Sequence, residues 1–72
     1  MEIKIGDTYR HSKKGGTYKI IAIAKHSETL EDLVIYEAQY ENSLAKVWAR
    51  PVDNFTEMVE VSGEMVKRFV KI

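Results

Sequence analysis

The sequence lacks cysteine, contains one proline and four glycines, and carries no net charge, because eleven Lys and Arg residues balance eleven Asp and Glu residues. Without cysteine there is no disulfide and no thiolate metal site, which suits a reducing cytoplasm. Without a basic excess, no overall field attracts the chain to nucleic-acid backbones. No apolar run approaches the roughly 20 residues that span a bilayer, and residues 1–10 lack a signal-peptide pattern. We therefore expect a cytoplasmic protein without a membrane segment.

The residues that are present indicate one small folded domain. The chain has 72 residues, of which 44% are hydrophobic and 31% charged, a balance typical of globular proteins. A chain this short buries only about 60% of the surface of its unfolded form, so packing or self-association must stabilise it. We expect a single β-barrel-like domain over residues 1–72, either monomeric or weakly dimeric.

The apolar pattern predicts short β-strands and no long helix. The predicted strands are one that ends near His11, then Thr17–Lys25, residues 33–40 and 45–50, and a last hairpin formed by residues 57–61 and 66–72. Gly15 and Gly16 favour a tight hairpin turn. Pro51 ends the third long strand, and Val52–Phe55 is expected to form a tight turn.

Thr17–Lys25 is apolar on both faces, and strict alternation places Tyr18, Ile20, Ala22 and Ala24 on the same one. Such a strand is expected to be central or strongly curved. The whole pattern predicts an all-β fold with at most one short helical turn, arranged as a small, strongly bent antiparallel sheet of the SH3-like barrel kind. Closure would hide the sheet edges. An open antiparallel sheet is the alternative.

Motifs spread along the chain resemble those of a small bacterial family catalogued as domain of unknown function 1653. The matching motifs are Tyr9-Arg10-His11, Tyr18-x-Ile20, Ala24-x-His26-Ser27-Glu28-Thr29, Val34-x-Tyr36 with Tyr40, Trp48-x-Arg50-Pro51 with Phe55, and Arg68-Phe69. The resemblance implies a compact β-rich domain, often the entire protein, with no settled biochemical activity. Residues 42–46 depart from the family pattern, because they are longer and poorer in glycine.

A polar run, His26-Ser27-Glu28-Thr29, connects two of the predicted strands. Loops held by rigid strands often carry binding sites. His26 can act as a general base or a hydrogen-bonding reader near neutral pH, and Glu28 can pair with Arg50. The alternative is that His26 caps backbone groups of the loop. His11, His26 and Glu28 lack the helical spacing of a metal site, so we predict no metal and no other cofactor.

Trp48 and Arg50 lie two residues apart, so an indole and a guanidinium can form one wall on the same strand face. Arg50 could hold a carboxylate or phosphate while Trp48, with Tyr36 or Tyr40, stacks on a flat or apolar group. The alternative is that Trp48 is the main core residue and Arg50 extends to solvent. The predicted ligand-binding residues are His26, Glu28, Tyr36, Trp48 and Arg50.

Three functions fit these residues. The first is a non-catalytic binding module for an anionic or aromatic ligand, namely a peptide carboxylate, a nucleotide or a single-stranded nucleic acid, the last disfavoured by the neutral charge. The second is a small hydrolase or lyase with His26 as general base. The third is a plain interaction or dimerisation domain. Ser27 points away from its neighbour His26 and no oxyanion donors are identified, so we assign no catalytic residue and favour a protein that is not an enzyme.

Overall fold

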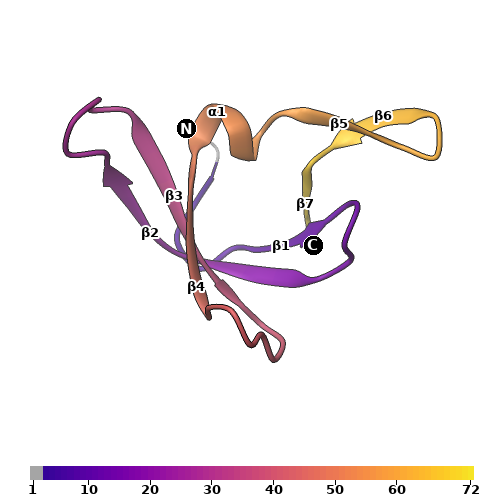
Figure 1. Ribbon diagram of the computed structural model, residues 1–72, viewed down its shortest axis with the longest axis horizontal. Coiled ribbons are helices and arrows are strands. Elements are labelled where there is room, and N and C mark those ends of the chain that lie inside the picture. The colour runs from indigo at the N-terminus through magenta and orange to yellow at the C-terminus, as the bar shows by residue number, and fades with distance from the viewer. Residues whose placement is uncertain (1–2) are drawn as a thin grey trace.

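The computed structural model describes residues 3–72, which fold into strands and a single helical turn. The elements are β1 (Thr8–His11), β2 (Thr17–Lys25), β3 (Asp32–Ala38), β4 (Val47–Pro51), α1 (Val52–Phe55), β5 (Met58–Val61), β6 (Glu64–Lys67) and β7 (Phe69–Lys71). Five strands form an antiparallel sheet in the order β4-β3-β2-β1-β7, and β5 pairs with β6 in a separate hairpin (Figure 1). Within residues 3–72, no helix is long and apolar enough to cross a membrane.

The long strand β2 is central and bent, as its two apolar faces predict. It pairs with β1 on one side and with β3 on the other, and its register with β3 shifts between Ile20 and Ala22. Such a bulge adds an unpaired residue, here Ile21, and exchanges the two faces beyond it. The prediction that Ala22 and Ala24 continue the face of Ile20 is therefore wrong, and Ile23 pairs with Val34 and packs against the core instead.

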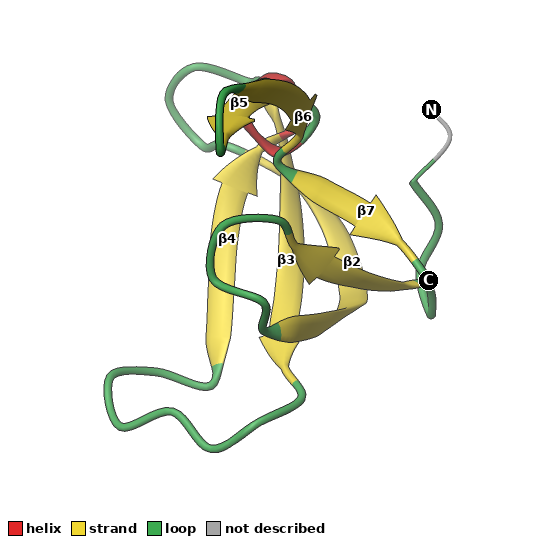
Figure 2. Ribbon diagram, turned by 90° about the vertical axis from the view of Figure 1, so that its right-hand side faces the viewer, coloured by secondary structure: helices red, strands yellow, loops and turns green. Residues whose placement is uncertain are grey.

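The sheet does not close into the predicted barrel. In the part of the chain that the structure describes, β4 and β7 are the two outer strands, and they do not pair with each other. Helix α1 lies between these two edges at one end of the bent sheet, and the β5–β6 hairpin projects outward from the same end, beyond β7 (Figures 1 and 2). The all-β class and the strongly bent antiparallel sheet are confirmed, whereas the likeness to SH3 domains stays a prediction.

Two local predictions differ from the structure. Val52–Phe55, expected as a tight turn, forms the single helical turn α1. The segment 66–72, expected as one strand, divides at Arg68, because β6 pairs with β5 whereas β7 pairs with β1. Arg68 itself joins three segments: its backbone N–H donates to the Glu57 carbonyl, and its own carbonyl accepts from the Ser12 N–H.

The hydrophobic core fills the concave face of the sheet. Its buried side chains are Ile3, Tyr9, Tyr18, Ile20, Val34, Tyr36, Ala38, Phe55 and Phe69. The rings of Phe55 and Phe69 are stacked, with centroids 4.1 Å apart and planes 4° from parallel. This contact attaches α1 to β7 and spans the opening between the two sheet edges.

Candidate functional site

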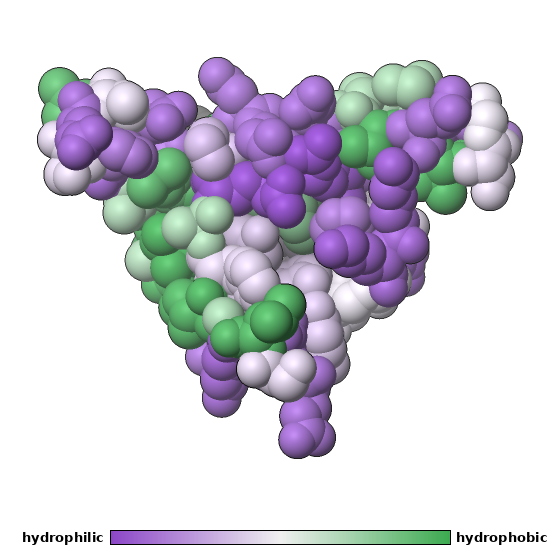
Figure 3. Space-filling model, in the orientation of Figure 1, coloured by the Kyte–Doolittle hydropathy of each residue, from purple (hydrophilic) through white to green (hydrophobic). Residues whose placement is uncertain are grey.

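The concave face carries a pocket of about 140 Å³ beside the core. It is lined by His11, Lys14, Tyr18, Tyr36, Tyr40, Asn42, Leu44, Trp48, Arg50 and Phe69, and we call it the arginine–aromatic pocket. Figure 3 shows this face hollowed at its centre, where strongly polar side chains meet less polar ones. The structure thus brings together Tyr36, Trp48 and Arg50, three of the five residues predicted from the sequence.

Strand pairing positions these three side chains. Tyr36 of β3 lies directly opposite Trp48 of β4, and Val34, which is fully buried, lies opposite Arg50. Paired residues of antiparallel strands project to the same side, so Trp48 and Arg50 both face the concave side. The alternation read from the sequence is therefore sufficient to place the indole and the guanidinium on one wall.

The guanidinium of Arg50 is held in place from three directions. Its Nε donates to the Tyr36 hydroxyl at 3.3 Å and its Nη1 donates to Oδ1 of Asn54 at 2.5 Å. The group also lies over the ring of Phe69, 5.5 Å from the centroid. Arg50 is half-buried and does not simply extend to solvent, and its bonding partners fix the orientation of the cation at the pocket.

Trp48 is half-buried and packs against the core without being its centre. The fully buried large side chains are instead Phe55, Ile20 and Val34. The indole N–H donates to the Ala45 carbonyl at 3.1 Å, so its polar edge is already bonded. The part of the ring that lines the pocket is available for contact with an apolar or flat group.

His26 and Glu28 lie in the β2–β3 turn and are not among the residues that line the pocket. Nδ1 of His26 accepts the backbone N–H groups of Glu28 and Thr29 at 3.1 and 3.3 Å. His26 therefore caps backbone groups of the turn, which is the role that the sequence offered as the alternative to a ligand contact. Glu28 is exposed, and Arg50 bonds Tyr36 and Asn54 rather than the Glu28 carboxylate considered from the sequence.

His11 is the buried counterpart of His26. Its Nδ1 accepts the backbone N–H groups of Lys13 and Lys14, both at 3.2 Å, and its ring packs edge-on against Phe69. Burial lowers the pKa of His11 below its ordinary value of 6.5, and the nearby cations Arg50, Lys14, Arg68 and Lys13 lower it further. The imidazole is therefore held neutral in a positively charged environment.

Two tyrosines form one wall of the pocket. The hydroxyls of Tyr18 and Tyr40 are 2.5 Å apart, and their rings meet edge-on with centroids at 5.5 Å. Burial and this hydrogen bond raise the pKa of Tyr18 to about 12. The Tyr18 hydroxyl therefore remains protonated near neutral pH, and this wall of the pocket is aromatic.

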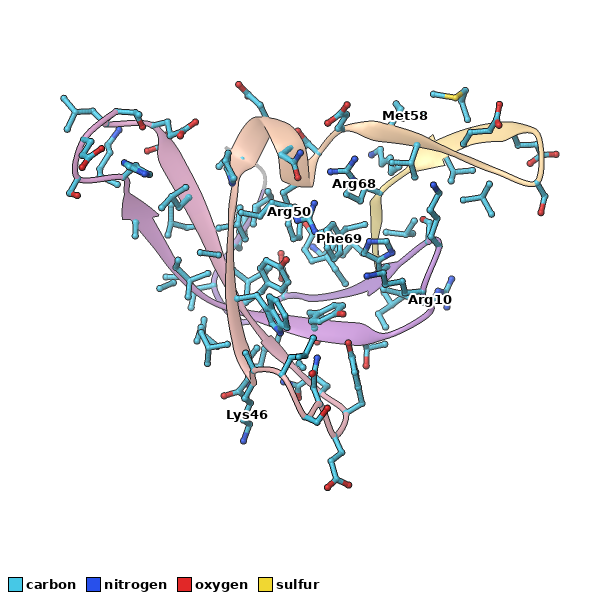
Figure 4. The ribbon with its side chains drawn as sticks, in the orientation of Figure 1. Arg10, Lys46, Arg50, Met58, Arg68 and Phe69 are labelled. Atoms are coloured by element: carbon cyan, nitrogen blue, oxygen red, sulfur yellow. The ribbon has the colours of Figure 1, made fainter. Side chains whose placement is uncertain are left out.

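Sequence reasoning missed Asn54 and Arg68. The sequence predicts a turn at Asn54, and it gives Arg68 no role in the site although Arg68 belongs to the matching Arg68-Phe69 motif. Figure 4 shows Arg50, Arg68 and Phe69 gathered in the concavity, whereas Arg10, Lys46 and Met58 lie at the periphery. The repeated His-Ser pair at positions 11 and 26 was an available signal for the two backbone caps, since each histidine directly precedes a turn.

The sequence matches the model of a protein family described as "Protein of unknown function (DUF1653)" over residues 7–71. The chain belongs to the DUF1653 family. A crystal structure of a DUF1653 protein from Bordetella bronchiseptica is similar to it, with a TM-score of 0.85 and 27% sequence identity over 99% of this chain and 88% of the other. No curated protein matches the sequence. Family membership confirms the resemblance drawn from the motifs, and the family description assigns no activity.

Proposed function

We propose that this DUF1653 domain is a non-catalytic binding module whose arginine–aromatic pocket holds a small anionic group. The observation that carries the proposal is the fixed guanidinium of Arg50 at a pocket that is lined mostly by aromatic rings. A guanidinium presents two parallel N–H donors to a carboxylate or phosphate, and a desolvated setting strengthens that contact. Arg50 would hold the anion, and Trp48 and Tyr36 would contact the group attached to it.

The size of the pocket limits what it can enclose. Sites for drug-sized ligands occupy roughly 300–1,000 Å³, whereas this pocket has about 140 Å³. It therefore suits one anionic group or one ring, with the rest of a larger ligand lying across the open face. A peptide carboxylate or a nucleotide meets this requirement. A long single-stranded nucleic acid is less well supported, because the formal net charge of the chain is zero.

The alternative functions have less support. A hydrolase or lyase with His26 as base would need a substrate site at the β2–β3 turn, where Nδ1 of His26 already accepts two backbone N–H groups. An interaction or dimerisation domain needs an apolar surface, and the exposed Met58 and Met65 of the β5–β6 hairpin favour it. Two exposed side chains define a partner less closely than the hydrogen-bonded guanidinium of Arg50 defines an anion. A cytoplasmic location and a monomeric or weakly dimeric state stay predictions.

Titration of small anions against the fluorescence of Trp48, the only tryptophan in the sequence, tests the proposal. We expect benzoate and phenyl phosphate to change the emission saturably in the wild type. Arg50→Lys keeps a charge but loses the fork of donors, so binding should weaken by about tenfold or more. Arg10→Ala removes an exposed arginine of β1 and should bind like the wild type. The proposal fails if neither anion perturbs Trp48, or if Arg10→Ala and Arg50→Lys behave alike.

A further inference from the structure

Asn54 of α1 holds two arginine side chains at one atom. Its Oδ1 accepts from Nη1 of Arg50 at 2.5 Å and from Nη1 of Arg68 at 2.6 Å. Arg68 reaches this point from the junction of β6 and β7, and it also donates to the Asn54 carbonyl at 3.2 Å. Two guanidinium groups from separate elements therefore lie side by side at the rim of the arginine–aromatic pocket (Figure 4).

The protein provides little negative charge to balance these two cations. Among residues 3–72, the carboxylate paired with either arginine is Glu57, which lies 3.7 Å from Nη2 of Arg68 and whose side chain is 56% exposed. A long, exposed ion pair of this kind contributes little. The partners of Arg50 are a hydroxyl, an amide oxygen and a phenyl ring, all uncharged. The Arg68 side chain is only 18% exposed, so water screens its charge poorly.

The two positive charges act on the same space as the pocket. Arg50 and His11 both line it, and Arg50, Lys14 and Arg68 each contribute to lowering the pKa of His11. Lys14 is itself a lining residue. Arg50 and Lys14 therefore line one small, partly desolvated volume, and Arg68 lies beside Arg50 at Asn54. Three cations in this arrangement favour a ligand with more than one negative charge.

We propose that the pocket selects a phosphate monoester over a carboxylate, with Arg50 as the direct contact, Arg68 as the second charge and Asn54 as the positioning residue. The inference rests on the proposed function of the same site. A phosphate monoester carries a charge of about −1.5 to −2 near neutral pH and three acceptor oxygens, so it can engage two adjacent guanidinium groups at once. A carboxylate offers two oxygens and one charge, which a single arginine satisfies.

Phenyl phosphate and benzoate are matched probes, because they share a ring and differ in the anion. At about pH 8, where the phosphate is a dianion, we expect phenyl phosphate to bind the wild type about tenfold more tightly than benzoate, as judged by Trp48 fluorescence. Arg68→Gln should bring the two affinities within about twofold of each other by weakening phenyl phosphate alone. Arg10→Ala, the control for loss of a surface charge, should keep the wild-type ratio.

Asn54→Asp gives a second variant with almost unchanged shape. The new carboxylate would neutralise the two arginines from within, so phenyl phosphate should lose about tenfold or more in affinity while the fold persists. We expect the fold to persist because Glu57 is exposed and can turn away from the added charge. Circular dichroism and thermal unfolding test this expectation. Equal affinities of the wild type for the two probes, or an unchanged ratio in Arg68→Gln, would overturn the phosphate selectivity and leave anion binding intact. Absence of any response to both probes would instead refute the binding function itself.

Discussion

Gly16 lies directly against the ring of Tyr40. A Cβ added at position 16 would come 2.5 Å from Cε1 and 3.0 Å from Cζ of that ring, which is too close for either atom to stay in place. The backbone at Gly16 is not in the left-handed region, so an alanine would be tolerated there apart from this contact. Glycine is therefore favoured at this position by the approach of the Tyr40 ring and not by the turn, because the ring must move to admit a Cβ.

Gly16→Ala is expected to lower the free energy of unfolding by about 1–3 kcal/mol, the usual cost of overpacking. The clash would push Tyr40 outward and break its hydrogen bond to Tyr18. Urea denaturation followed by circular dichroism measures the loss.

The double variant Gly16→Ala, Tyr40→Ala is the matched control for this contact. Removing the ring removes the clash, so adding Gly16→Ala to Tyr40→Ala should cost much less than adding it to the wild type. Equal costs in the two backgrounds would show that the glycine acts through the turn and not through Tyr40.

The sequence predicts only those residues of the candidate site that lie on two neighbouring strands, β3 and β4. Period-two alternation places Trp48 and Arg50 on one face, and the adjacent strand brings Tyr36 opposite them. Asn54 and Arg68 are fourteen positions apart and meet through α1 and the β6–β7 junction. No local pattern encodes such a contact, because it depends on where the C-terminal segment crosses the open side of the sheet.

The β5–β6 hairpin is the most independent element of the fold. It forms its own two-stranded sheet, and it joins the rest of the described structure through contacts at Glu57, Lys67 and Arg68. Met58 and Met65 on the hairpin are 47% and 61% exposed. A two-stranded hairpin is marginally stable alone in water, so its opening does not require the five-stranded sheet to unfold.

Native-state hydrogen exchange is expected to separate these two parts. Backbone amides in the β5–β6 ladder should exchange much faster than those of Ile20 and Val34, which are fully buried in β2 and β3. Exchange measured by NMR at several low urea concentrations would report the opening free energies. Protection of the hairpin equal to that of the central strands would show that it unfolds only with the whole domain.

The sequence predicts the positions of most strands, but it does not predict which strands pair with each other. Alternation and turn residues located β1, β2, β3 and β4 to within a few residues, since these signals are local. The division at Arg68 has no glycine or proline to mark it. It arises because β1 offers a free edge to β7. The bulge at Ile21 is likewise a feature of the pairing between β2 and β3, which no local pattern marks.

In the whole molecule, aromatic rings fill the concave side of the sheet, and the edges of the sheet stay open. Phe55 and Phe69 stack across the opening, and Tyr9, Tyr18 and Tyr36 meet them edge-on or meet one another. Barrel closure was expected because it removes edges. The 72 residues instead provide a short β4 and a three-residue β7 as outer strands, and short edges are less prone to pair with other chains.

Neutral overall charge conceals an uneven distribution of charge. His11, buried to 8% exposure, lies near Arg50, Lys14, Arg68 and Lys13, so burial first and then these cations lower its pKa in the folded state. In the unfolded chain the pKa returns to about 6.5. Above that value both states are neutral and the contribution to stability is complete. As the pH falls below about 6.5, His11 becomes protonated in the unfolded chain while it stays neutral in the folded protein. The free energy of unfolding therefore decreases until the pH reaches the lowered pKa of the folded state.

His11→Asn should therefore reduce the loss of stability that accompanies a fall in pH below about 6.5. The Asn side-chain oxygen can still accept the backbone N–H groups that Nδ1 of His11 accepts from Lys13 and Lys14, as asparagine does in turns. Urea unfolding of wild type and variant at matched pH values gives the two slopes, and an NMR titration of the His11 ring gives its pKa directly. Identical slopes for the two proteins, or a His11 pKa at or above 6.5, would show that the cations gathered around the pocket do not act on this ring as the structure places them.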